Sequence, residues 1–159
     1  MGPLAHRGQY DKVRSLIEAG VAEGATLVVG GPGRPEGFGR GYYVRPTVFA
    51  DATVGMRIAK EEIFGPVLTM MSYEDEGHAI EIANATEYGL ASYVQAGTLE
   101  EARKVGAKMR AGRVYLNGAA VDRSMPFGGY KKSGNGREWG VFGLEEYLEV
   151  KYISAALTK

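Results

Sequence analysis

Cysteine is absent from the 159 residues of this chain. Its absence excludes disulfides, thiolate metal sites and thiol nucleophiles within the sequence, and it favours a reducing compartment such as the cytoplasm. Histidine is almost as scarce, with only His6 and His78. A metal site needs several ligands at matched spacing, so we expect no metal and take His6 to be solvated.

A charge excess of either sign is also missing, because 19 basic and 19 acidic side chains cancel. Without a long-range field the sequence predicts neither a nucleic-acid partner nor an anionic membrane surface. No apolar run approaches the ~20 residues needed to cross a bilayer, and no secretory signal pattern opens the chain. We therefore expect a soluble, cytoplasmic protein.

Helical and strand patterns alternate along the chain. This alternation predicts an α/β fold, in which helices flank a mostly parallel sheet and an early strand is an antiparallel addition. No linker or internal repeat interrupts the pattern, and one lobe is expected. The expected helices are Gln9–Ala22, His78–Ala85, a capped helix from Thr98 to about Ala111, and Phe142–Leu148; the expected strands are Ala25–Val29, Val44–Phe49, Ile63–Tyr73, Leu90–Gln95, Arg113–Asn117 and Val150–Leu157.

The stretch AKEEIFGPVL places two carboxylates, Glu61 and Glu62, directly before Phe64 and a Gly-Pro turn. A carboxylate facing two neighbouring donors is the usual means of binding a vicinal diol such as a ribose. Phe64 would then offer an apolar wall to a ring beside that sugar. The alternative is a solvated turn before a strand, with Phe64 in the core.

A second cluster, SMPFGGYKKSGNGRE, runs from Ser124 to Glu138 and is too rich in glycine for a helix. Its lysines precede SGNG, whereas the lysine of a phosphate-binding P-loop follows its glycines, so the spacing argues against phosphate binding. Glu138 lies beside Trp139, where an apolar indole would raise a carboxyl pKa and permit proton exchange. The alternative roles for Glu138 are an arginine pair or a helix cap.

These motifs resemble the aldehyde dehydrogenase family. The resemblance rests on AKEEIFGPVL at 59–68, YYVRPTVFAD at 42–51, EYGLASYV at 87–94, GRVYLNG at 112–118 and PFGGYKKSGNGRE at 126–138, which occur in the family's order. It covers essentially the whole chain. It implies that residues 1–149 are the C-terminal part of a catalytic domain and that residues 150–159 are an oligomerisation strand, which pairs with a neighbouring subunit.

The resemblance also implies site residues for the cofactor NAD or NADP. Glu62 matches the glutamate that binds the ribose hydroxyls beside the nicotinamide, and Phe64 matches the aromatic that packs near that ribose. Asn117 matches an asparagine at a strand end that supports the active-site loops.

For the aldehyde substrate, the resemblance implies that Phe127 lines the tunnel. Val121 lies in the variable anchoring loop at 119–123. Glu138 matches a buried glutamate on a proton path. The identity of the aldehyde does not follow from these residues.

In the family mechanism a cysteine thiolate attacks the aldehyde, hydride passes to the nicotinamide, and a glutamate-activated water releases the acid. This chain has no cysteine, so we expect it to be a fragment that is inactive alone and binds little cofactor, with the missing motifs upstream. The alternative is a non-catalytic module that self-associates. A phosphate-binding or nucleic-acid module is disfavoured by the zero net charge.

Overall fold

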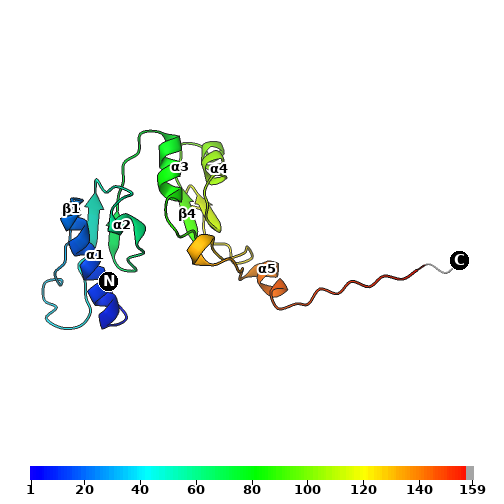
Figure 1. The fold of residues 1–159 in the computed structure, drawn as a ribbon, viewed down its shortest axis with the longest axis horizontal. Helices are drawn as coiled ribbons and strands as arrows, with labels where there is room; N and C mark the ends of the chain where they lie inside the picture. The colour runs from blue at the N-terminus through cyan, green and yellow to red at the C-terminus, as the bar shows by residue number, and fades with distance from the viewer. Residues whose placement is uncertain (157–159) are drawn as a thin grey trace. The chain divides into compact units, whose positions relative to one another are not determined.

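The computed structural model describes residues 1–156 and has helices alternating with strands in small sheets, which confirms the α/β class (Figure 1). The chain divides into two compact units, Met1–Thr86 and Glu87–Lys159. The sequence indicated one lobe, because the connection near Thr86 carries no linker composition. We call these parts the first unit and the second unit.

The first unit contains a three-stranded sheet in the order β1-β2-β3. Strand β1 (Thr26–Val29) pairs antiparallel with β2 (Thr47–Ala50), as expected for the early strand, and β2 pairs parallel with β3 (Val67–Thr69). Its helices are α1 (Arg7–Ala22), α2 (Arg57–Lys60) and α3 (Glu76–Asn84).

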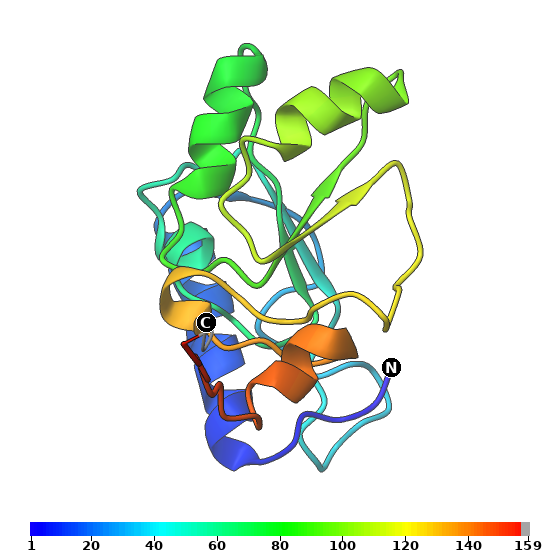
Figure 2. The ribbon, with the colours of Figure 1, turned by 90° about the vertical axis from the view of Figure 1, so that its right-hand side faces the viewer.

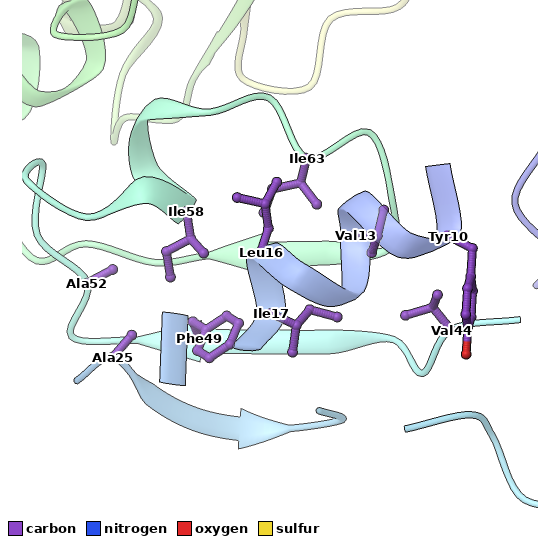
Figure 3. Packing of buried hydrophobic residues seen from close by; sticks show 10 residues of the cluster. All are labelled: Tyr10, Val13, Leu16, Ile17, Ala25, Val44, Phe49, Ala52, Ile58 and Ile63. Atoms are coloured by element: carbon purple, nitrogen blue, oxygen red, sulfur yellow. The ribbon is translucent and has the colours of Figure 1, made fainter. Parts of the chain in front are cut away.

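Helix α1 supplies four of the ten residues in the core cluster of the first unit. Its Val13, Leu16 and Ile17 recur at helical spacing and are at most 1% exposed. They pack with the fully buried Phe49 of β2 and with Ile58 of α2, as Figure 3 shows. The helix begins where the ring of His6 accepts a hydrogen bond from the Gln9 amide, and it ends before Gly24, which has a φ of +92°. His6 is thus exposed, as predicted, and also caps the helix.

The second unit contains two parallel strands, β4 (Ala91–Val94) and β5 (Arg113–Leu116), which lie side by side (Figure 2). Helix α4 (Leu99–Gly106) connects them in a parallel crossover, and its Ala102 is fully buried. A short 3₁₀ turn, η1 (Lys131–Ser133), and helix α5 (Gly140–Glu145) follow.

Helix α4 begins with the capping box that the sequence predicts at Thr98. The Thr98 hydroxyl accepts from the Glu101 amide at 3.2 Å, and the Glu101 carboxylate accepts from the Thr98 amide at 2.9 Å. We expect Thr98→Ala to lower the free energy of unfolding of the second unit by about 1 kcal/mol. Urea titration followed by the fluorescence of Trp139 measures this change.

The matched control is Glu100→Ala on the same helix, which removes only an exposed ion pair to Lys104 at 3.0 Å. An exposed pair of this kind contributes less than about 0.5 kcal/mol. Equal destabilisation by the two variants would contradict the capping argument.

Several boundaries differ from the sequence expectations. The strand expected over Ile63–Tyr73 is confined to Val67–Thr69, because the preceding residues are held by α1 through side-chain hydrogen bonds to their carbonyls. Helix α4 ends at Gly106 and not near Ala111, and α2 was not predicted. With only four residues, α2 is too short for a periodic signal.

The closing strand expected over Val150–Leu157 is not formed within this chain, where residues 150–156 belong to no sheet and run as an extended segment (Figure 1); its pairing with a second chain stays a prediction. A strand requires a hydrogen-bonded neighbour, and nothing in the described part of this chain pairs with the segment. Leu157 lies outside the described residues. Within residues 1–156, no helix is both long enough and apolar enough to span a membrane.

Candidate functional site

The segment 61–65 is held against α1 by three side-chain contacts in the first unit. The side-chain amide of Gln9 donates, through Nε2, to the carbonyls of Ile63 and Phe64 at 2.9 and 3.0 Å. The Lys12 ammonium donates to the Glu62 carbonyl at 2.6 Å. These bonds fix the backbone, so the directions of the side chains in this segment are determined by the fold.

Burial alternates along this segment. Ile63 is 8% exposed and joins the core, whereas Phe64 is 73% exposed with a φ of +58°. Gly65 approaches α1 so closely that a Cβ there would lie 2.7 Å from a Val13 methyl. Ile63 is buried between Glu62 and Phe64 in the sequence, so the carboxylate of Glu62 and the ring of Phe64 point outward. The alternative that Phe64 belongs to the core is wrong for this chain.

The two neighbouring glutamates have different partners. Glu61 forms an ion pair with Arg57 one helical turn earlier, with 2.6 Å between Oε1 and Nε. The hydrogen bond from Arg57 lowers the pKa of Glu61 below its ordinary value. This small contribution to stability is complete above the ordinary carboxyl pKa and is lost as the pH falls through the lowered one. The Glu62 side chain is exposed, and only its carbonyl is held by Lys12.

An exposed carboxylate beside an exposed aromatic ring is able to bind a sugar and an adjoining ring. The two carboxylate oxygens accept hydrogen bonds from two adjacent hydroxyls, and the ring face provides an apolar contact. The geometry separates Glu62 from Glu61, which the sequence pattern alone did not.

In the second unit, Phe127 and Glu138 are brought together by a two-residue antiparallel bridge. Each backbone amide donates to the carbonyl of the other, at 2.7 and 2.6 Å. The Phe127 ring stacks on Trp139 with 4.9 Å between ring centroids. Both bridge residues line a hollow of about 280 Å³, together with Arg137 and Glu146.

Glu138 is exposed in this chain, and the burial that the family resemblance implied for it is not formed within residues 1–156. Its backbone is bonded to Phe127, and both residues line the open hollow at the surface of the second unit. The alternative role as a helix cap is also excluded, because residue 139 precedes α5 and no side chain caps that helix.

Val121 does not line the hollow that Phe127 and Glu138 share. It is 58% exposed, in the irregular segment that follows β5. The neighbouring turn is held by Asp122, whose carboxylate accepts from the Ser124 hydroxyl at 2.6 Å and amide at 2.9 Å. These bonds lower the pKa of Asp122.

Asn117 ties the ends of the two strands of the second unit together. Its amide donates to the Val94 carbonyl at 2.8 Å, and its Oδ1 accepts from the Ala96 amide at 2.9 Å. It adopts a φ of +47°, which asparagine tolerates better than most residues. These bonds hold the loops that leave β4 and β5 at the same end of the sheet.

The glycine-rich loop 126–138 is packed against backbone. A Cβ at Gly128 would lie 2.1 Å from the Gly136 carbonyl oxygen, and one at Gly129 would lie 2.5 Å from Ser133. The Arg137 guanidinium closes the loop with bonds of 2.9 to 3.1 Å to three of its carbonyls. Close packing thus accounts for these glycines, and phosphate binding is not needed to explain them.

Both histidines accept hydrogen bonds from backbone amides. Nδ1 of His6 accepts from the Gln9 amide, and Nδ1 of His78 accepts from the Glu74 amide, each at 3.2 Å. Over residues 1–156, no group of three or more histidine, aspartate or glutamate side chains is placed to hold a metal ion.

Comparison with known proteins identifies the family. The model of the aldehyde dehydrogenase family matches residues 1–153. A 3-succinoylsemialdehyde-pyridine dehydrogenase from Pseudomonas sp is 57% identical over 153 residues, which are 96% of this chain and 32% of that protein. The chain belongs to the aldehyde dehydrogenase family and spans about a third of the length of the curated relatives it matches.

Solved structures give the same result. A mutant of aldehyde dehydrogenase C from Pseudomonas syringae, complexed with NAD+ and octanal, superposes with a TM-score of 0.93 at 52% identity, over 98% of this chain and 33% of that one. An aldehyde dehydrogenase from Mycobacterium tuberculosis complexed with NAD+ superposes with a TM-score of 0.88 at 43% identity, over 97% of this chain and 33% of that one.

Proposed function

We propose that this chain contributes the nicotinamide-ribose contact and part of the substrate tunnel to an NAD(P)-dependent aldehyde dehydrogenase. The observation that carries the proposal is the segment 61–65, in which a buried Ile63 and a bonded backbone present Glu62 and Phe64 outward. The NAD+ complexes of two similar structures support the cofactor class. Residues 1–149 would be the C-terminal part of the catalytic domain.

In this function, Glu62 accepts hydrogen bonds from the two hydroxyls of the nicotinamide ribose, and Phe64 limits the positions that the ring can take. The bound cofactor would accept the hydride. Phe127 and Val121 contact the aldehyde, and Glu138 belongs to a proton path. The oxidation itself requires a cysteine nucleophile, which this chain lacks.

We therefore expect the isolated chain to show no aldehyde-dependent NADH formation above a blank. We also expect at most weak NAD+ binding by calorimetry, because Glu62 and Phe64 contact only one end of the dinucleotide. Turnover above the blank, or submicromolar binding of NAD+, would contradict the proposal.

A chimera tests the proposal directly. In the Pseudomonas relative, the matching segment is replaced by this chain. NADH formation is then followed with the semialdehyde for which that enzyme is named. At 57% identity we expect the chimera to fold and to retain activity. A chimera that folds, as judged by circular dichroism, but makes no NADH would count against the proposal.

Self-association is the alternative role. The segment after α5 exposes Val150, Tyr152 and Ile153 by 98%, 88% and 79%, which favours contact with another chain. We propose that residues 150–159 form the oligomerisation strand by pairing with a second copy, although residues 157–159 lie outside the described structure. Light scattering coupled to size exclusion tests this, and a monomer at all concentrations would oppose it.

A further inference from the structure

The guanidinium of Arg113 contacts three aromatic rings from three separate segments. Its Cζ lies 4.9 Å from the ring centroid of Tyr115, 5.4 Å from that of Phe127 and 5.0 Å from that of Trp139. A cation within about 6 Å of a ring face is attracted by the ring quadrupole. One side chain on β5 therefore connects the strand to the loop and to the residue that precedes α5.

The register of the sheet explains this arrangement. Arg113 and Tyr115 are two residues apart on β5, so both side chains point to the same face. Tyr93 on β4 is the register partner of Tyr115, and the two rings stack at 4.9 Å with an interplanar angle of 13°. Tyr115, on which Tyr93 stacks, thus forms one side of the guanidinium site.

The other side is formed by the bridge between Phe127 and Glu138, which sets the Phe127 ring beside that of Trp139. Trp139 has a φ of +68°, a conformation that costs energy for a bulky residue and persists only when its surroundings hold it. The contacts of its indole with Phe127 and with Arg113 are such constraints.

We propose that Arg113 is a positioning residue that orients the Phe127 and Trp139 rings. Its relevance to the aldehyde rests on the proposed function, in which Phe127 lines the substrate tunnel. Arg113 acts there through Phe127 and fixes the direction of that ring. The planar guanidinium is suited to this because it stacks on aromatic faces, which the lysine ammonium does not.

The first test uses the wild-type chain. Three ring faces shift the NMR resonances of the Arg113 δ-methylene protons upfield from those of exposed arginines such as Arg103. Resonances of Arg113 that coincide with those of Arg103 would overturn the proposal. This measurement involves no aldehyde or cofactor, so its failure is distinct from a failure of the proposed function.

The second test uses Trp139, the only tryptophan of the chain. We expect Arg113→Met to shift its emission to longer wavelength and to increase its quenching by acrylamide, while the far-ultraviolet circular dichroism is unchanged. Arg113→Lys restores the wild-type emission in part. Arg103→Met, which removes the same charge from the exposed face of α4, leaves the emission as in wild type.

Identical emission and quenching of Arg113→Met and Arg103→Met would overturn the proposal. If Arg113→Met does not fold, Arg113→Lys and the wild-type resonances decide the result. In an active chimera, Arg113→Met is expected to raise the KM for the aldehyde with little change in the KM for NAD+. Equal changes in both values would show that Arg113 acts on the whole fold and would also contradict the proposal.

Discussion

Glu62→Gln in the active chimera is expected to lower kcat/KM for NAD+ by roughly 10- to 100-fold. A hydrogen bond to a charged group contributes about 1.5–3 kcal/mol, and 1.4 kcal/mol corresponds to a factor of ten. The amide retains the shape of the carboxylate but loses its charge and one acceptor oxygen. The nicotinamide is then held less firmly, so we expect hydride transfer to slow more than aldehyde binding weakens.

The neighbouring Glu61→Gln is the matched control for this prediction. It removes the same charge one residue away, but the Glu61 carboxylate is already bonded to Arg57. We expect its kcat/KM for NAD+ to stay within about twofold of the parent, since an exposed ion pair contributes under 1 kcal/mol. Steady-state kinetics with each substrate varied in turn provide the comparison. Equal losses of kcat/KM for NAD+ in the two variants would contradict the proposal that Glu62 binds the ribose.

Gly112→Ala is expected to destabilise the second unit by about 3 kcal/mol or more, at the upper end of overpacking costs. A Cβ at position 112 would lie 1.8 Å from the carbonyl oxygen of Gly128 and 2.7 Å from its carbonyl carbon. Both atoms are backbone, so no flexible side chain can move aside. The Gly112 amide also donates to the Gly89 carbonyl, which accepts from Tyr130 as well, so any shift breaks the attachment of the loop.

Gly136→Ala is the matched control, in the loop against which Gly112 packs. A Cβ there has nothing within 4 Å, and Gly136 does not have a positive φ. Its unfolding midpoint in urea, followed by Trp139 fluorescence, should lie close to that of wild type. If Gly112→Ala unfolds at the same urea concentration as this control, the close packing of residues 112 and 128 is not important for stability.

The loop packing also bears on function. Phe127 and Glu138 are at the two ends of the segment that these glycines allow to fold back, and their mutual backbone bonds form only if it does so. Loss of the close approach at Gly112 is therefore expected to disorder both residues together. Substitutions of the loop glycines would then affect the candidate tunnel through the backbone.

The sequence by itself determined helix α1, the start of α4 and the family. Apolar residues at helical spacing predicted α1, and a hydroxyl with a glutamate three residues later predicted the start of α4, because both signals depend on neighbours a turn apart. The motifs at 59–68 and 126–138 carried the resemblance to aldehyde dehydrogenases, which the matching of residues 1–153 confirms. Each of these features is local in the chain.

The tertiary structure alone decided the features that depend on distant residues. Gln9 and Lys12 of α1 hold the backbone carbonyls of residues 62–64, and no pattern in AKEEIFGPVL contains that information. Likewise, Arg113 meets Trp139 only because the loop folds back onto β5. Side-chain contacts between residues far apart in sequence arise from packing, and packing is decided when the whole chain folds.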